Sequence, residues 1–240
     1  MTRLMLHALT SAATEADVSV PNHVRISCGA LVALASEVLD DDQDFLSEPS
    51  RTIEVADYHN NLLSAYAANG GVIPISLGAC FSGRSPLTTF VSERQDTYSA
   101  LLSRLGSRQE YVVRVLKASE DEPAEGGDKP LTGRDFLRSK LGDRDQRRTR
   151  QVAQTATCRR LLDVARTWAD ELELAVKPPE DVVIDAAALV RPDRVSGLTS
   201  GLVELSEDAS AAGLAIRMTG PCPPYTFASK LLEADGKHDA

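Results

Sequence analysis

The sequence predicts an α+β protein with two domains, and three observations support this prediction. Short apolar runs with an alternating pattern, such as Glu110–Ala118, indicate strands with one buried face. Longer stretches with apolar residues at three- and four-residue spacing, such as Ser50–Asn69, indicate amphipathic helices. An acidic stretch without a large apolar residue, 119–130, separates two groups of such elements. We therefore expect an N-terminal ferredoxin-like α/β domain over 1–118 and a C-terminal α+β domain over 119–240.

The N-terminal half begins with strands. The apolar run Leu4–Leu9 predicts the first strand, and the runs on either side of Cys28-Gly29 predict a hairpin. The alanine-rich part of the second run, Leu31–Ala35, also fits a helix. The further elements expected in this half are a helix over Ser50–Asn69 that ends at Gly70-Gly71, a strand over Val72–Phe81, a helix from Pro86 to Gly106 with Ser85 as its N-cap, and a strand over Glu110–Ala118.

The C-terminal half begins with a long helical section. Its pattern starts near Leu131 and extends up to Val176, just before Pro178-Pro179. The elements expected after it are a strand over Val182–Val190, a turn at Arg191-Pro192-Asp193, a helix from about Gly201, and a last strand over Leu214–Met218.

The last strand leads into a stiff aromatic segment. We expect Gly220-Pro221 to end the strand, because proline has no N–H to donate to a neighbouring strand. Pro223-Pro224 then keeps the chain extended, and Tyr225 and Phe227 follow. The segment docks either on its own sheet, as a structural clasp, or on a partner protein. We favour the clasp.

Composition and charge narrow the classes of function. The formal charge is −9, so we expect neither broad nucleic-acid binding nor attraction to an anionic membrane, because both require a basic face. One basic run, 144–150, has no interleaved aromatic residues and is better explained as a solvated helix face than as a nucleic-acid site. No stretch approaches the ~20 apolar residues of a membrane span, and no secretory signal is evident, so we expect a cytosolic protein.

The chain shows no motif for catalysis, cofactor binding or metal binding. Its four cysteines lie far apart without a C-x-x-C pair, which predicts free thiols rather than a zinc or redox site. The run Asp40–Asp44 lacks the glycine and the glutamate of a calcium-binding loop, so we expect a solvated turn. His59 lies beside Asp57 on a predicted helix, where a packed histidine is commoner than a catalytic one. We predict no enzyme activity, catalytic residue, cofactor or metal ligand.

Three separated stretches resemble the gas vesicle protein F/L family. The first runs from His59-Asn60-Asn61 to Gly71–Phe81 and is similar to the family's histidine-containing helix followed by a strand of the form V-L-P-x-R-F-G-T-x-F. The second, Gly133–Lys140, is similar to G-x-x-Y-L-x-x-K, and the third, Gly220–Phe227, to G-P-W-P-P-Y-x-F. Their order and spacing agree with the family over nearly the whole chain.

Two positions depart from the family pattern. Ser76-Leu77 stands where Arg-Phe is usual, which removes a charged donor, and Cys222 stands where Trp is usual, which removes a large anchor. The resemblance therefore does not choose between the F-type and the L-type members.

The resemblance implies a non-enzymatic minor protein of gas vesicle formation, located at this cytoplasmic organelle. It implies an N-terminal ferredoxin-like domain and a C-terminal domain with long paired helices in a helical hairpin. The implied partners are the small hydrophobic shell protein GvpA and other accessory gas vesicle proteins, and neither nucleic acid nor a membrane. The alternative function is a ferredoxin-like ligand-binding or regulatory module. The residues expected in partner binding or structure are His59, Pro74, Gly78, Phe81, Arg217, Gly220, Pro221, Pro224, Tyr225 and Phe227.

Overall fold

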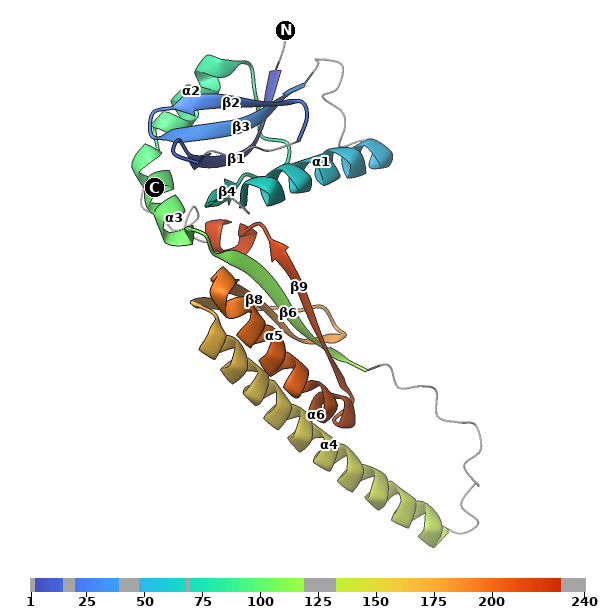
Figure 1. Cartoon of the computed structure of the whole chain (residues 1–240). Coiled ribbons are helices and arrows are strands. Elements are labelled where there is room, and N and C mark those ends of the chain that lie inside the picture. Colours follow the sequence, from blue (N-terminus) through green and yellow to red (C-terminus); the bar gives the residue numbers. More distant parts are fainter. Residues whose placement is uncertain (1–2, 15–19, 39–47, 68–69, 119–132, 230–240) are drawn as a thin grey trace. The chain divides into compact units, whose positions relative to one another are not determined.

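The chain forms two compact units, each built from a sheet and the helices packed on it (Figure 1). Residues up to Glu110 and residues from Gly220 on form the first unit, and Tyr111–Thr219 form the second. The described segment 220–229 therefore belongs to the same unit as the first strand. The predicted α+β class is confirmed, since both units combine helices with a sheet.

The computed structural model describes residues 3–14, 20–38, 48–67, 70–118 and 133–229. The turn expected at Asp40–Asp44 and the loop expected at 119–130 lie outside the described residues. The domain ranges 1–118 and 119–240 stay a prediction, because a compact unit need not fold alone.

An antiparallel sheet of five strands forms the centre of the first unit. Four strands follow the order β2-β3-β1-β4, and β5 also pairs with β1. Every residue of β1 from Leu4 to Thr10 is buried. Because successive side chains of a strand point to opposite faces, both faces of the sheet are covered at β1. The strands are β1 (Arg3–Ser11), β2 (His23–Cys28), β3 (Leu31–Val38), β4 (Val72–Pro74) and β5 (Cys80–Phe81).

Three helices cover this sheet: α1 (Pro49–Ala67), α2 (Arg84–Ser92) and α3 (Gln95–Leu105). All three contact β1, and α2 also contacts β2 whereas α3 contacts β4. The buried cluster between α1 and the sheet consists of Ala8, Val32, Leu34, Leu62, Leu63, Tyr66 and Val72. The predicted hairpin β2–β3 and the helix α1 are confirmed, and the helical alternative for Leu31–Ala35 is excluded.

Two predicted elements of this unit were wrong. Val72–Phe81 is not one strand, because the chain turns between β4 and β5 through Gly78, whose φ of 95° favours glycine. The helix predicted from Pro86 to Gly106 is two helices that break between Ser92 and Gln95, and its N-cap is Gly83 rather than Ser85. The break lets α2 and α3 reach opposite edges of the sheet.

The second unit is a four-stranded sheet with a long helix across it. The strand order is β7-β8-β6-β9. The end of β6 bonds to residues that immediately precede β8 and β9, at Asp181 and Gly213, so β6 runs antiparallel to both. The elements are β6 (Gln109–Lys117), α4 (Gly133–Trp168), β7 (Glu171–Leu174), β8 (Val182–Val190), a 3-10 turn (Pro192–Arg194), α5 (Val195–Glu204), α6 (Ser206–Ala211) and β9 (Leu214–Cys222).

Three boundaries differ from the predicted ones in this unit. The helix α4 ends at Trp168 rather than near Val176, because Glu171–Leu174 pairs with β8 as a strand. The helix α5 begins at Val195, six residues before the predicted start at Gly201. The strand β9 continues through Gly220-Pro221, which is possible because β9 lies at the sheet edge, where proline is tolerated.

The helices α4 and α5 pack side by side, and two glycines of α5 lie at the contact (Figure 1). A Cβ atom at Gly197 would lie 2.4 Å from the ring of Trp168, and one at Gly201 would lie 2.7 Å from Cγ1 of Val164. The two glycines therefore let α5 approach α4 more closely than larger residues would allow. The long helix is thus paired with a short one, α5, which is followed by the still shorter α6.

We predict that Gly197→Ala destabilises the protein by about 1–2 kcal/mol. Alanine favours helices over glycine by up to ~1 kcal/mol, but the added methyl group overpacks the Trp168 ring, which typically costs about 1–3 kcal/mol. The control is Gly142→Ala in α4, where a Cβ would meet nothing within 4 Å and where alanine should stabilise. Urea unfolding measures both, and equal effects of the two substitutions would contradict the packing account.

Candidate functional site

The end of the chain folds back onto the first unit as a clasp, which we define as Gly220–Ser229. Residues 225–229 form a helical turn, in which the Ala228 N–H donates to the Pro224 carbonyl at 2.9 Å. Phe227 is only 3% exposed and Pro224 is buried. The segment therefore packs within the protein as a clasp, but on the first unit rather than, as predicted, on the sheet of its own strand. Its aromatic residues also lie on a helical turn instead of an extended segment.

Glu110 anchors the start of this turn. The Thr226 N–H donates to Oε2 of Glu110 at 2.9 Å, and the Thr226 hydroxyl donates to Oε1 at 2.7 Å. A carboxylate in this position caps the free N–H groups of a helical turn. Burial raises the pKa of Glu110, while its bonds from Thr226 and from the Phe227 backbone act in the opposite direction. Burial and the negative charge of Glu110 also raise the pKa of the Cys222 thiol.

Tyr225 anchors the clasp through a chain of buried polar groups. Its hydroxyl lies 2.5 Å from Nε2 of His59 in α1. Nδ1 of His59 lies 2.9 Å from Nδ1 of His7 in β1, and Nε2 of His7 lies 2.8 Å from Oγ of Ser36 in β3. The pairing register of β1 with β3 shifts between Leu6 and Ala8, so His7 is the extra residue of a β-bulge. Bulges of this kind redirect a side chain.

The hydrogen bonds of this chain must run in one direction. Either each group donates from Ser36 towards Tyr225, or each donates from Tyr225 towards Ser36, because a neutral imidazole has one donor and one acceptor nitrogen. One added proton is compatible with all of the bonds. Two are not, because both Nδ1 atoms of His7 and His59 would then carry a hydrogen at their shared contact.

Burial favours the neutral forms of His7 and His59. Burial, followed by the charges of His59 and His23, lowers the pKa of His7 to about 4 from an ordinary value of 6.5. Burial also lowers the pKa of His59 and raises the pKa of Tyr225 to about 12. His23 belongs to a neighbouring group, in which its Nε2 lies 3.0 Å from the hydroxyl of Tyr66. This arrangement holds segments together and offers no exposed nucleophile.

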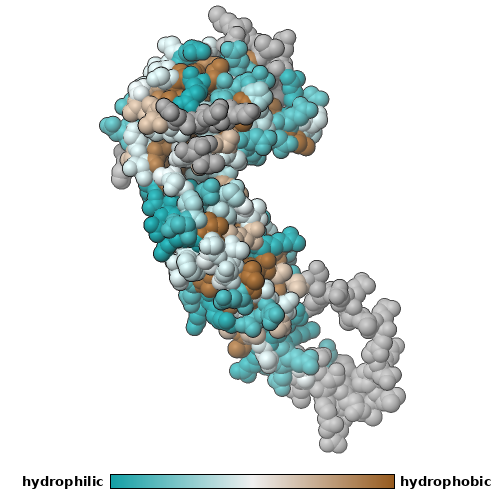
Figure 2. All heavy atoms as spheres, in the orientation of Figure 1, coloured by the Kyte–Doolittle hydropathy of each residue, from teal (hydrophilic) through white to brown (hydrophobic). Residues whose placement is uncertain are grey.

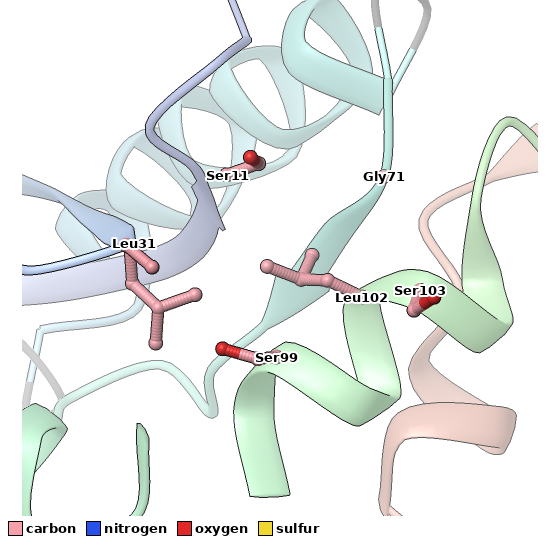
Figure 3. Close-up of a pocket in the computed structure, with 7 residues that line it drawn as sticks. Ser11, Leu31, Gly71, Ser99, Leu102 and Ser103 are labelled. Carbon is pink, nitrogen blue, oxygen red and sulfur yellow. The ribbon is translucent and has the colours of Figure 1, made fainter. Parts of the chain in front are cut away.

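The first unit also contains a cavity of about 310 Å³ between β3 and α3 (Figure 3). The side chains of Leu31, Leu102 and Ser99 point into this space in the view of Figure 3. Gly71 lies at its rim, where a Cβ would come 3.0 Å from the Gly106 carbonyl. The residues that line the cavity are Ser11, Ala30, Leu31, Gly71, Ser99, Leu102 and Ser103, and none of them is charged.

The described part of the chain contains neither a candidate metal cluster nor a helix fit to span a membrane. No cluster of three or more histidine, cysteine or acidic side chains there has the geometry to hold a metal ion. In the same residues, no helix combines the length and the apolar character that crossing a membrane requires. All four cysteines are free thiols, and Cys28 is buried.

Of the residues singled out from the sequence, His59 and Tyr225 are in contact, although 166 positions separate them. Pro74 pairs with Ala8 at the end of β4. Phe81 in β5 pairs with Leu4 in β1, and the ring of Phe81 lies 5.2 Å from the ring of Phe90. The exposed residues in the set are Arg217, Gly220 and Pro221, all on β9.

Sequence reasoning missed four members of the clasp anchors: His7, Ser36, Glu110 and Thr226. The signal for His7 was its place within an apolar run that had to be buried, because a buried polar group needs a bonding partner. No comparable signal marks Ser36 or Thr226, whose bonds depend on residues far along the chain.

Known proteins resemble the chain in both sequence and fold. A sequence model of gas vesicle synthesis proteins GvpL/GvpF matches residues 10–229. The chain belongs to the GvpL/GvpF family. It is a gas vesicle-related protein, and the family name implies a location at the gas vesicle.

Individual relatives agree with this assignment. The chain is 29% identical to gas vesicle protein L of Streptomyces sp. over 78% of its own length and 71% of that protein. It is 27% identical to gas vesicle protein F of the same organism over 86% of the chain and 88% of that protein.

Two crystal structures of GvpF share the fold. That from Anabaena sp. has a TM-score of 0.71 at 17% identity, covering 95% of this chain and 96% of that one. That from Microcystis aeruginosa has a TM-score of 0.67 at 16% identity, covering 94% and 98%. Because both structures are nearly fully covered, the likeness extends over both units.

We predict that Tyr225→Phe destabilises the protein by about 1–3 kcal/mol, because it leaves a buried nitrogen of His59 without its partner. The control is Tyr58→Phe, whose hydroxyl donates to the Pro21 carbonyl at an exposed site and should cost less. Phe227→Ala should cost about 3–5 kcal/mol. Chemical unfolding measures all three, and unchanged stability of both clasp variants would mean that the clasp is not part of the core.

We also predict that acid weakens the fold through His7. Its pKa in the folded chain, about 4, lies below its ordinary value of 6.5, so the unfolded chain binds the extra proton. The stabilising contribution is complete above pH 6.5 and is lost as the pH falls from about 6.5 towards 4, by on the order of 3 kcal/mol.

Unfolding free energies measured from about pH 7 to 5 test this, because most carboxylates titrate below that window. In His7→Gln the slope over this window should flatten. An unchanged slope would contradict the assignment to His7.

Proposed function

We propose that this protein is a non-enzymatic assembly or structural factor that binds the hydrophobic shell protein GvpA during gas vesicle formation. The observation that carries the proposal is the family match over residues 10–229. The Streptomyces proteins named as gas vesicle proteins L and F are themselves matched over most of their length. Other accessory gas vesicle proteins are further partners of the same kind.

The buried histidines of the first unit support a binding role rather than a catalytic one. The histidines that a sequence scan would single out are buried and bonded to each other, so they stabilise the clasp. A catalytic centre would instead need titratable groups that a substrate can reach. The first unit is thus a scaffold held by the clasp, which suits a protein that presents surfaces to partners.

We place one GvpA contact at Arg217. It is exposed on β9, and in the described part of the chain its guanidinium group has no hydrogen bond or ion pair. An arginine in this position offers several donors for a partner's carbonyl or carboxylate groups. The buried residues among those expected from the family resemblance, by contrast, already have contacts within the protein, and these contacts account for their presence.

Co-expression with GvpA tests this proposal. The tagged protein should retain GvpA through purification, and deletion of its gene should abolish or deform gas vesicles. Arg217→Glu should reduce the retained GvpA, whereas Arg84→Glu, an exposed arginine on α2, should not. Normal vesicles after deletion together with no retained GvpA would refute the function, while equal retention by both variants would refute only the contact at Arg217.

The uncharged cavity beside α3 favours a second candidate, a ligand-binding or regulatory module. Its volume of about 310 Å³ could hold a small neutral molecule with hydrogen-bonding groups. A thermal-shift screen addresses this, because a ligand that binds only the folded state raises its stability. A ligand whose effect disappears in Ser99→Leu, which fills the cavity, would support this function.

A further inference from the structure

Helix α4 concentrates positive charge in an acidic protein. Gly133–Trp168 holds ten arginine or lysine residues and four aspartates, a formal charge of +6, whereas the rest of the chain holds 16 basic and 31 acidic residues. This charge does not help the helix to form, because like charges four positions apart repel each other. Arg144 and Arg148 stand in that relation, and both are exposed.

One face of α4 is packed, and the opposite face is open. Thr157, Leu161 and Ala165 are buried on the packed face. The open face carries what we call the outer stripe, whose steps of three and four residues align it along the helix. The outer stripe consists of Arg148, Val152, Thr155, Ala156 and Arg159, all of which are exposed.

The outer stripe combines an apolar centre with charged ends. Val152 is 66% exposed, the kind of side chain that gains from being covered. Arg148 and Arg159 flank it, about 16 Å apart at 1.5 Å per residue. Figure 2 shows mainly hydrophilic surface along α4, with hydrophobic surface only in small spots. The stripe is therefore too small to act through apolar contact alone.

The arginines at the ends of the stripe have no acidic partner among the described residues. Neighbouring arginines do: Arg160 pairs with Asp208, and Arg166 pairs with Asp163. Arg148 and Arg159 thus keep their full attraction for carboxylates of another molecule.

We propose that the outer stripe is the docking surface for a helical segment of a partner protein that carries carboxylates beside a row of apolar side chains. Two helices that pack along their axes bring apolar residues together at the centre and charged residues together at the flanks. The acidic remainder of this chain repels an acidic partner elsewhere, so the attraction at the stripe determines where it binds. The surface lies on α4, so this proposal does not rest on the GvpA contact at Arg217.

A nucleic acid fits the stripe less well. Single strands bind through aromatic side chains on which bases stack, and the outer stripe contains none. Double-stranded nucleic acid requires a broad basic surface, and the formal charge of the chain is −9.

The test uses the full chain and a labelled peptide of about 18 residues. In this peptide, leucines recur at three- and four-residue spacing and glutamates recur at the same spacing beside them. A helix formed by the peptide therefore carries a row of leucines next to a row of carboxylates. A second peptide has the same composition in scrambled order. Fluorescence anisotropy should show binding of the first peptide, weaker binding of the scrambled one, and a loss of affinity as salt is added.

Matched variants locate the binding surface. Arg148→Glu with Arg159→Glu should weaken binding of the ordered peptide about tenfold or more. Adding Val152→Ser to this double variant should weaken binding further. The control, Arg84→Glu with Lys177→Glu, makes the same change in net charge at exposed sites off the stripe and should leave affinity within about twofold. Circular dichroism and thermal unfolding check that each variant is folded. If the charge-reversal variants do not fold, the milder pair Arg148→Gln with Arg159→Gln replaces them.

Three results would overturn the proposal. The first is no binding of the ordered peptide. A segment of this same chain that covers the stripe would give that result too, because it would block the peptide. The second is equal weakening by the stripe variants and the control. The third is tighter binding of a single-stranded oligonucleotide of the same net charge, which would assign the stripe to nucleic acid.

Discussion

The first unit depends on one constraint, the burial of polar groups that can be satisfied only by each other. His7 is fully buried in the central strand, and its two ring nitrogens bond to His59 and Ser36. His59 then needs a partner for its remaining nitrogen, and the hydroxyl of Tyr225 supplies it. Because a buried polar group without a partner costs about as much as a lost hydrogen bond, the sheet, the helix α1 and the clasp hold each other in one arrangement. His59 lies in one of the stretches that resemble the gas vesicle family, and in this family member it is part of the core.

The second unit depends on close packing on one side of a helix and leaves the other side open. Gly197 and Gly201 bring α5 against Trp168 and Val164 of α4, and α4 in turn covers the sheet through Leu161. The arginines on its open face contribute nothing to that core. One helix thus serves stability with one face and leaves the other face open for the docking that we propose.

The sequence predicted what local pattern determines. The apolar run Val182–Val190 was predicted as a strand with the bounds that the structure shows, and the motif of Tyr225 led to the family. Errors arose where tertiary contacts override local signals. Nothing local breaks the helix between α2 and α3, and Pro221 remains within a strand because that strand lies at a sheet edge. The bond between His59 and Tyr225 could not be predicted, because only the folded chain brings the two together.

A double-mutant cycle on His59 and Tyr225 tests the central claim most directly. The free energy of unfolding is measured for the native chain, His59→Gln, Tyr225→Phe and the double variant. If the two side chains stabilise the fold as a bonded pair, the losses should fall short of additivity by about 0.5–3 kcal/mol, because the second substitution removes a bond that is already broken. Losses that add within about 0.3 kcal/mol would show that the two residues act independently, and would contradict a clasp held by this buried chain.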